Sequence, residues 1–168
     1  TLEEDASPLA YVTALEFGRQ CGCRSYLDFG AGVGSGGILF ARHGFDVALA
    51  DISSTMLRFS EWRFGNRGIP ATCIDLKSRS LPGQAFDLVT AMDVFEHLVD
   101  PVETADRLWA ALKPGGFLYA RIATESDEDR PQHIVRDFGP TFERMQKLGF
   151  VQVWHDDWLW GHQVFQRS

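Results

Sequence analysis

The sequence predicts an α/β fold built around a mostly parallel β-sheet with helices on both of its faces. Short apolar runs alternate along the chain with segments of helical periodicity, a pattern typical of βαβ units with right-handed crossovers. The runs are apolar at nearly every position, which indicates strands buried on both faces of a parallel sheet. The last two runs are joined by a connection too short for a parallel crossover, so we expect one antiparallel strand at the end of the chain.

The predicted strands are separated by turn residues or by helical segments. The third strand is the weakest of the set, and the last two strands form the antiparallel hairpin. The predicted strands span residues 26–29, 47–50, 71–75, 86–91, 117–122, 150–154 and 161–166.

The helix that begins at Asp100 has the clearest boundaries. Asp100 is a good N-cap, Pro101 suits the first helical position, and Glu103 completes the spacing of a capping box. An apolar stripe follows, and the Lys-Pro-Gly-Gly segment at residues 113–116 is expected to end the helix and turn into the next strand. Three other predicted helices span residues 8–20, 36–43 and 138–148. A fourth is capped by Ser53 and extends through Trp62.

Composition and charge limit the class of protein. The chain has 168 residues, close to the roughly 150 residues of a typical domain. Its net charge of −7 argues against a nucleic-acid partner, because such proteins usually present a basic surface. No apolar run approaches the about 18 residues of a membrane span. The three cysteines do not form a disulfide framework, so we expect reduced thiols and a cytoplasmic protein.

A glycine-rich segment at residues 27–37 leaves the first predicted strand and enters a helix. Its glycines allow a tight turn and a close approach of the backbone to a ligand. Gly32, Gly34 and Gly37 fit the G-x-G-x-x-G pattern, so a nicotinamide-dinucleotide site is a rival interpretation. Asp28, which stands just before these glycines, would repel a pyrophosphate and would suit a ligand that carries an ammonium group.

Two further carboxylates follow the next predicted strands. Asp51 can accept hydrogen bonds from two ribose hydroxyls through its two oxygens, and Asp75 can accept one from an exocyclic amine such as that of adenine. Asp28, Asp51 and Asp75 all stand at or near the carboxyl ends of strands, where open α/β sheets bind ligands. Each alone could be a helix cap or a surface carboxylate, and the ordered set indicates a nucleoside site.

Several segments together carry a family resemblance, and they lie at residues 27–34, 51–57, 75–89, 96–101 and 112–116. In these segments the chain resembles the class I S-adenosylmethionine-dependent methyltransferases, over about residues 25–167. The resemblance implies a Rossmann-like fold with a seven-stranded sheet in the order 3-2-1-4-5-7-6, strand 7 being antiparallel. It also implies an N-terminal helical segment at residues 1–24 and an S-adenosylmethionine-binding domain at residues 25–168.

The same resemblance implies which residues hold the methionine part of the cofactor. Asp28 and the backbone around Gly30 and Gly32 would bind this part, in the loop that Gly34 completes. Met92 would lie beside the methionine chain.

The nucleoside part is expected to lie against the second and third strands. The resemblance assigns the ribose to Asp51 and the adenine to Asp75 together with the amide of Leu76. Ile52 and Met56 would flank the adenine and the ribose.

An oxygen acceptor of high pKa would need a general base, and His97 and His133 are the candidates. If the segment after the fourth strand is helical, Asp93, Glu96 and His97 share one face. In the quinone-biosynthesis O-methyltransferases, which this pattern resembles, a similar cluster can hold a divalent metal. No fourth ligand is evident here except His133 at long range, so we expect no metal site.

Other segments at the ligand edge are candidates for the acceptor side. Residues 123–136 form a long acidic stretch that could cover the site or bind the acceptor. Trp158 and Trp160 could line an acceptor pocket, and Tyr11 could face it. The short stretch before Asp28 leaves little room for an acceptor cap, so a missing segment, a partner or a homodimer could complete the site.

The sequence therefore predicts methyl transfer from S-adenosylmethionine to a small molecule. No Asn/Asp-Pro-Pro-aromatic tetrapeptide follows the fourth strand, where residues 92–95 read Met-Asp-Val-Phe, and this disfavours methylation of amino groups on bases or glutamine. Two alternatives stay open: a non-catalytic S-adenosylmethionine-binding regulatory module, and an NAD(P)-dependent oxidoreductase.

Overall fold

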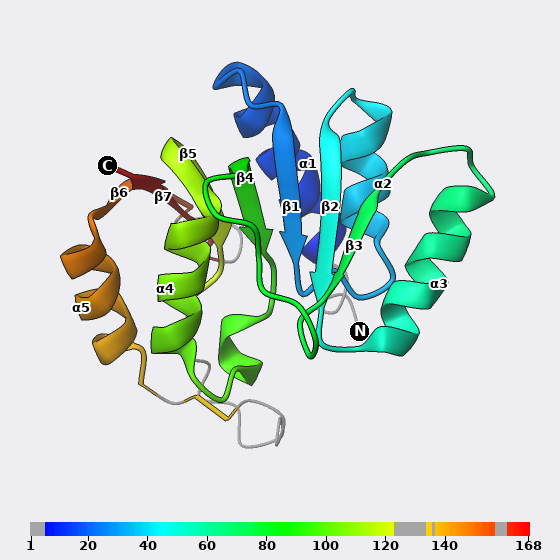
Figure 1. The fold of residues 1–168 in the computed structure, drawn as a ribbon. Coiled ribbons are helices and arrows are strands. Elements are labelled where there is room, and N and C mark those ends of the chain that lie inside the picture. Colours follow the sequence, from blue (N-terminus) through cyan, green and yellow to red (C-terminus); the bar gives the residue numbers. More distant parts are fainter. Residues whose placement is uncertain (1–5, 123–133, 136, 157–160) are drawn as a thin grey trace.

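The computed structural model describes residues 6–122, 134–135, 137–156 and 161–168. Its centre is a seven-stranded sheet in the order β3-β2-β1-β4-β5-β7-β6 (Figure 1). The first five strands pair in parallel, and β7 lies antiparallel to both β5 and β6. The predicted fold class, strand order and antiparallel last strand are confirmed.

The elements have clear bounds. The strands are β1 Ser25–Phe29, β2 Asp46–Asp51, β3 Thr72–Asp75, β4 Phe86–Ala91, β5 Leu112–Ala120, β6 Phe150–His155 and β7 Gln163–Arg167. The helices are α1 Ala6–Gln20, α2 Ser35–Arg42, α3 Ser54–Gly65, the 3-10 helix η1 Phe95–His97, α4 Pro101–Ala111 and α5 Gly139–Leu148.

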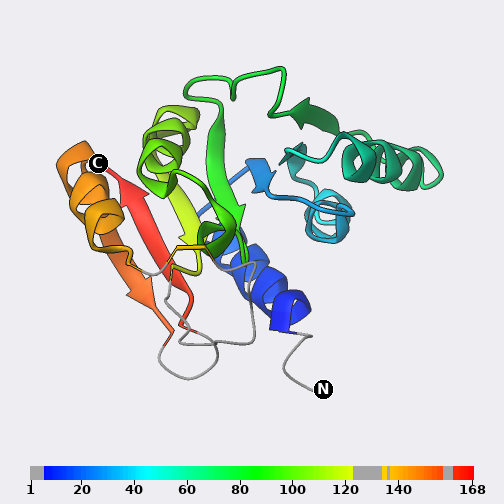
Figure 2. The same ribbon diagram turned by 90° about the horizontal axis from the view of Figure 1, so that it is seen from below.

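Helices cover both faces of the sheet, as Figure 2 shows from below: α4 and α5 on one face, and α1, α2 and α3 on the other. Each layer has its own apolar core. Leu108 and Met145 pack with the α4/α5 face of the sheet, and Ala14 and Phe40 pack with the other face. Successive residues of a strand point to opposite faces, so Asp28 lies on the same face as Tyr26, beneath α1 and α2.

The two helix caps predicted from the sequence, Ser53 and Asp100, are both present. The Asp100 carboxylate accepts a hydrogen bond from the Glu103 amide at 2.8 Å, and Pro101 opens α4. The Ser53 hydroxyl accepts one from the Met56 amide at 3.3 Å at the start of α3. These contacts satisfy amides that a helix leaves without intrahelical partners.

The segment at residues 113–116 differs from its prediction. It belongs to β5, which begins at Leu112, directly after α4 ends. The register against β4 shifts between Phe86 and Leu88, so the segment forms an irregularity in the strand rather than a separate turn.

In the part of the chain that the structure describes, no helix combines the length and the apolar character needed to cross a membrane.

Gly37 lets α2 pack closely on β2, and this contact fixes the loop that precedes α2. A Cβ atom built at Gly37 would lie 2.4 Å from Cδ2 of the fully buried Leu49 and 3.1 Å from the Phe64 ring. We expect Gly37→Ala to lower the free energy of unfolding by about 1–3 kcal/mol, the usual cost of overpacking. Chemical denaturation measures this change.

Gly65→Ala, at the end of α3, is the matched control. Nothing lies within 4 Å of a Cβ atom built at Gly65, so we expect stability to stay equal or rise slightly. Equal effects of the two substitutions would contradict the packing argument.

Candidate functional site

The candidate site lies where the carboxyl ends of β1, β2 and β3 meet. Parallel pairing places Phe29 beside Ala50, and Asp51 beside Asp75. The loop after β1 crosses the end of β2, because the amides of Gly30 and Ala31 both donate to the Ala50 carbonyl, at 2.8 and 3.1 Å. The glycine loop and the two carboxylates therefore share one edge of the sheet.

The glycines of this loop are needed for its shape. Gly30 has φ of 74° and Gly34 has φ of 72°, in the left-handed region that favours glycine. A Cβ atom at Gly30 would lie 2.5 Å from Cγ2 of Val94, whereas nothing lies within 4 Å of one at Gly32. The loop is thus closely packed at Gly30 and open at Gly32. The open position allows a ligand to approach the backbone closely.

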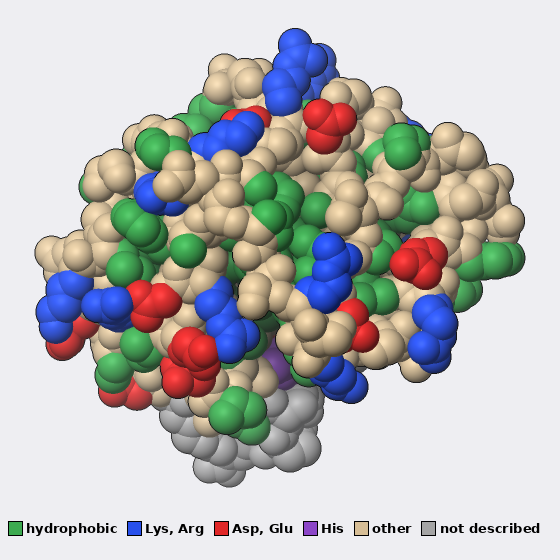
Figure 3. Space-filling view, viewed as in Figure 1, with side chains coloured by type: hydrophobic (Ala, Val, Ile, Leu, Met, Phe, Trp, Pro, Cys, Tyr) green, Lys and Arg blue, Asp and Glu red, His purple; other side chains and the backbone are tan. Residues whose placement is uncertain are grey.

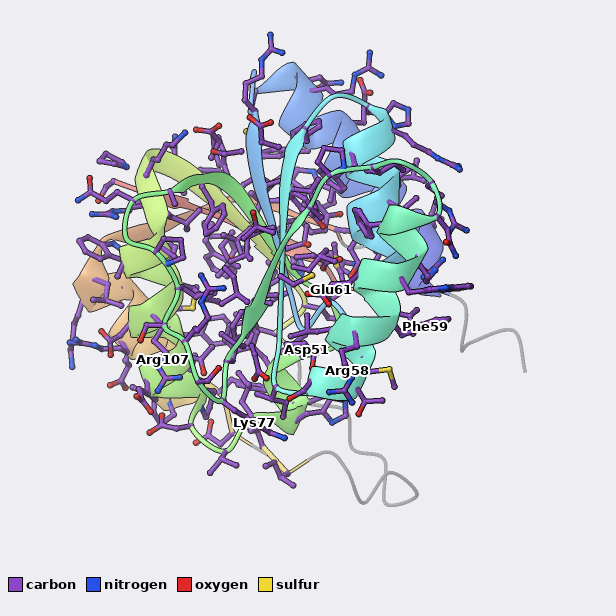
Figure 4. The ribbon with its side chains drawn as sticks, turned by 45° about the vertical axis from the view of Figure 1, so that its right-hand side comes forward. Asp51, Arg58, Phe59, Glu61, Lys77 and Arg107 are labelled. Atoms are coloured by element: carbon purple, nitrogen blue, oxygen red, sulfur yellow. The ribbon has the colours of Figure 1, made fainter. Side chains whose placement is uncertain are left out.

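Asp51 is held in place by two backbone amides. Its Oδ2 accepts from Gly32 at 2.8 Å and its Oδ1 accepts from Ser53 at 2.7 Å. Each carboxylate oxygen keeps a further lone pair, so both can still accept from hydroxyl groups. Figure 4 shows Asp51 where β2 passes toward α3. The side chain that was predicted to bind ribose is oriented by the glycine loop itself.

Helix α3 also braces the glycine loop, and sequence reasoning missed this contact. The Ser60 hydroxyl donates to the Gly32 carbonyl at 3.1 Å. The Arg63 guanidinium donates to the Val33 carbonyl and to the Ser35 hydroxyl, the latter at 3.0 Å. Ser60 is fully buried. A serine on the apolar face of a predicted helix was the available signal, since a buried hydroxyl needs a hydrogen-bond partner.

Asp75 lies beside Asp51 and is also fixed by short contacts. Its Oδ2 accepts from the Ser54 hydroxyl at 2.7 Å and its Oδ1 accepts from the Lys77 amide at 3.0 Å. These hydrogen bonds, that of Ser54 first, lower the pKa of the Asp75 carboxyl, so it is ionised at neutral pH. The carboxylate keeps lone pairs for an amine donor.

The Leu76 amide, which the family resemblance assigns to the adenine, has a backbone partner in the structure. This amide donates to the Asp51 carbonyl at 3.0 Å, because the pairing of β2 with β3 continues one residue past the strand. The apolar side chains predicted near the nucleoside do lie at this edge. Ile52 is 66% exposed and Met56 is 43% exposed, whereas Met92 is buried after β4.

Asp28 lies at the centre of a buried hydrogen-bond network. Its side chain is 0% exposed, and its Oδ1 accepts from the Tyr11 hydroxyl at 2.9 Å and from the Thr90 hydroxyl at 3.2 Å. The Tyr26 hydroxyl lies 2.6 Å from that of Thr90. Among the described residues, Oδ2 of Asp28 has no hydrogen-bond partner. A buried acceptor without a partner is costly, so this atom is suited to a ligand donor.

Burial raises the pKa of the Asp28 carboxyl to about 6, because the charged form loses its hydration. Hydrogen bonds from Tyr11 and Thr90 oppose this rise, and the charge of Asp51 adds to it. At neutral pH the carboxyl is therefore ionised, but within reach of protonation. The arrangement provides an anion that a nearby cation would stabilise.

The segment after β4 does not meet the condition under which Asp93, Glu96 and His97 would share one helical face. Asp93 has φ of 50°, which no residue in a right-handed α-helix adopts, and only the short helix η1 follows. Glu96 is buried and His97 is exposed, so the three side chains do not share one face. Asp93 pairs with Arg121, which follows β5, at 3.4 Å.

Two side chains that sequence reasoning missed lie near this pair, His162 before β7 and Asp156 after β6. Both are buried, and the Asp156 amide donates to the His162 carbonyl at 2.8 Å. Burial lowers the pKa of His162, Asp93 and Asp156 raise it, and Arg121 lowers it, with a net decrease. The signal was their position, since the end of β5 and the start of β7 meet at the same edge.

Several predicted acceptor residues lie outside the described residues. They are residues 123–133 and 136 of the long acidic stretch, which include His133, and the two tryptophans Trp158 and Trp160. The described residue Ile134 donates its amide to the Glu96 carbonyl at 2.9 Å, which places it beside η1. Tyr11, predicted to face the acceptor, has its hydroxyl on Asp28. Within the described ranges, no three or more His, Cys, Asp or Glu side chains are grouped to hold a metal ion.

The surface viewed in Figure 3 carries Lys and Arg side chains interspersed with Asp and Glu. It shows no continuous basic patch of the kind that nucleic-acid backbones require.

Comparisons with known proteins agree with this geometry. The protein-family profile described as a methyltransferase domain matches residues 27–118. A ubiquinone biosynthesis O-methyltransferase of Methylobacterium nodulans is 35% identical over 104 residues, which are 57% of this chain and 39% of the relative. A relative of the same description from Photorhabdus laumondii is 33% identical over 103 residues, or 57% of this chain and 41% of the relative. The chain thus spans about two fifths of the length of these relatives.

Solved structures show the same fold. The phosphoethanolamine N-methyltransferase 2 of Haemonchus contortus, solved with S-adenosyl-L-methionine, has a TM-score of 0.65 and 25% identity, covering 76% of this chain and 33% of that one. A methyltransferase from Aquifex aeolicus has a TM-score of 0.65 and 18% identity, covering 85% of this chain and 80% of that one. With more than half of its residues matched by the family profile, this chain belongs to the methyltransferase-domain family, whose typical methyl donor is S-adenosylmethionine.

Proposed function

We propose that this chain transfers a methyl group from S-adenosylmethionine to a small-molecule acceptor. The observation that carries the proposal is the buried carboxylate of Asp28, which keeps Oδ2 without a partner among the described residues, beneath a glycine loop at the sheet edge. When bound, S-adenosylmethionine supplies an electrophilic methyl group on a positively charged sulfur. The residues of this chain then have to bind it, orient the acceptor and exclude water.

The described residues fit the two ends of such a cofactor. Asp28 offers a negative charge to the ammonium group, and Asp51 offers two carboxylate oxygens to the ribose hydroxyls. The exposed apolar side chains of Ile52 and Met56 offer a surface for the adenine ring, and Asp75 offers an acceptor for its amine. Desolvating these apolar side chains on binding is favourable.

The charge of Asp28 argues against the nicotinamide-dinucleotide alternative. At about 6 Å and an effective ε of about 20, one pair of unit charges interacts by roughly 3 kcal/mol. This interaction with Asp28 is attractive for an ammonium group and repulsive for a pyrophosphate. The glycine pattern alone suits either ligand, so the carboxylate decides between them.

An oxygen acceptor is the class that the relatives favour, because the curated relatives are named O-methyltransferases. A hydroxyl acceptor needs a base with a pKa near neutrality, and a histidine is suited to that role. His97 is exposed on η1, in the segment that follows β4. His133 precedes Ile134, whose amide is bonded to the same helix. We propose His97 and His133 as the candidate bases.

The cofactor proposal predicts which ligands stabilise the protein. We expect S-adenosylmethionine, or its demethylated product, to raise the melting temperature, because each binds the folded state, and we expect NAD and NADP to leave it unchanged. Asp28→Asn should reduce the shift, because the amide keeps the shape of the side chain and loses its charge. Thermal-shift assays measure these changes, and stabilisation by NAD alone would overturn the proposal.

The ribose role of Asp51 predicts a loss of affinity in a folded protein. Asp51→Ala should weaken S-adenosylmethionine binding by about 1.5–3 kcal/mol, the usual worth of hydrogen bonds to a charged group. Calorimetry compares it with Asp46→Ala, which removes an exposed carboxylate at the other end of β2. Unchanged affinity for Asp51→Ala, or equal losses for both variants, would contradict the assignment.

The base proposal predicts an effect on turnover rather than on cofactor binding. Labelled S-adenosylmethionine and pools of small hydroxyl compounds first identify an acceptor. Replacing His97 or His133 by Ala should then lower turnover by about a hundredfold and leave the affinity for S-adenosylmethionine unchanged. His43→Ala, at the exposed end of α2, is the control. Full activity of the double variant would remove both histidines from the mechanism.

A further inference from the structure

The side chain of Tyr11, on helix α1, reaches the candidate cofactor site. Its hydroxyl donates to Oδ1 of Asp28 at 2.9 Å. Its ring lies against α2 at Gly36, where a Cβ atom would be only 2.2 Å from Cε1 of the ring. The absence of a side chain at position 36 therefore makes room for Tyr11. The contact joins a helix that precedes the sheet to a carboxylate inside the sheet.

The hydrogen-bond network around Asp28 has a definite direction. An ionised carboxylate only accepts, so the Thr90 hydroxyl gives its single proton to Asp28. Tyr26 must then donate to Thr90, at 2.6 Å. Oδ1 of Asp28 receives two donors, from α1 and from β4, and Oδ2 receives none from the described residues. The network thus satisfies Oδ1 and leaves Oδ2, which is also buried, without a donor among the described residues.

We propose that Tyr11 is a positioning residue of the cofactor site: its hydrogen bond to Oδ1 fixes the Asp28 side chain and leaves Oδ2 for the ammonium group of S-adenosylmethionine. This inference rests on the proposed function. It makes α1 part of the cofactor site and not only a cover for the sheet.

The electrostatic surroundings of Asp28 explain why such a residue is needed. Burial and the charge of Asp51 both favour the protonated carboxyl, and the pKa is about 6 even with two hydroxyl donors in place. The backbone amide of Gly37 also faces the carboxylate from α2 and lowers the pKa of Asp28. The negative charge of Asp93 contributes to the raised pKa of Tyr11. Removing the Tyr11 donor should raise the pKa of Asp28 further. A protonated Asp28 offers no charge to an ammonium group.

The pH dependence of binding separates this role from simple packing. Calorimetry should compare S-adenosylmethionine binding to wild type and to Tyr11→Phe at pH 6 and at pH 8. We expect an about tenfold loss of affinity at pH 6, where Asp28 is largely protonated in the variant, and a clearly smaller loss at pH 8. Comparing proteins at each pH cancels the titration of the ligand itself.

Phe17→Leu is the matched control, because it also alters α1. Phe17 packs edge-on against Phe117 with ring centroids 5.1 Å apart. We expect any loss of affinity in this variant to be equal at the two pH values. An equal loss for Tyr11→Phe as well would overturn the proposal.

A second pair of variants guards against a misfolded Tyr11→Phe. Thr90→Val removes the other donor to the same oxygen, and it should shift the dependence on pH in the same direction. In an Asp28→Asn background, Tyr11→Phe should show no dependence on pH beyond that of its parent. A persisting dependence, or a Thr90→Val variant without one, would overturn the proposal. Failure of wild type to bind S-adenosylmethionine at either pH would instead overturn the proposed function.

Discussion

The burial of one carboxylate constrains this whole edge of the molecule. The alternation of β1 places Asp28 on the same face as Tyr26, between the sheet and helices α1 and α2. A buried charge needs donors, and the fold supplies them from two separate elements, Tyr11 on α1 and Thr90 on β4. The hydrogen bond from Tyr11 thereby ties α1 to β1. A close-packed core would otherwise favour an apolar residue at this position.

The same edge is organised by a second set of contacts that fix the backbone of the glycine loop. Asp51 accepts from the Gly32 amide, while Ser60 donates to the Gly32 carbonyl from α3. Both the amide and the carbonyl of Gly32 therefore have a side-chain partner. Arg63 in turn donates to the Val33 carbonyl and the Ser35 hydroxyl. Because this loop is ordered by side chains of the protein itself, a ligand does not have to order it on binding, and that saves conformational entropy.

How far the sequence predicts these features depends on the separation of the residues involved. Asp28, Asp51 and Asp75 could be assigned to one edge because each stands at the end of its own strand, and parallel strands end together. The contacts of Asp28 could not, because Tyr11 and Thr90 are 17 and 62 residues away in the chain. The left-handed backbone at Asp93 and the hydrogen bond from the Leu76 amide to the Asp51 carbonyl could not be predicted either. Neither the backbone conformation at Asp93 nor the partner of the Leu76 amide can be read from the local sequence pattern.

The two halves of the edge differ in how their charges are balanced. Within the described residues, Asp28 and Asp51 are held by hydroxyl and amide donors, so their negative charges are not cancelled by a neighbouring cation. On the other half, Asp93 is paired with Arg121, and burial keeps the nearby His162 neutral by lowering its pKa. A cationic ligand is therefore attracted by the uncancelled charges of Asp28 and Asp51. Under the proposed function, these two uncancelled charges favour a position of the sulfonium cofactor along β1 and β2.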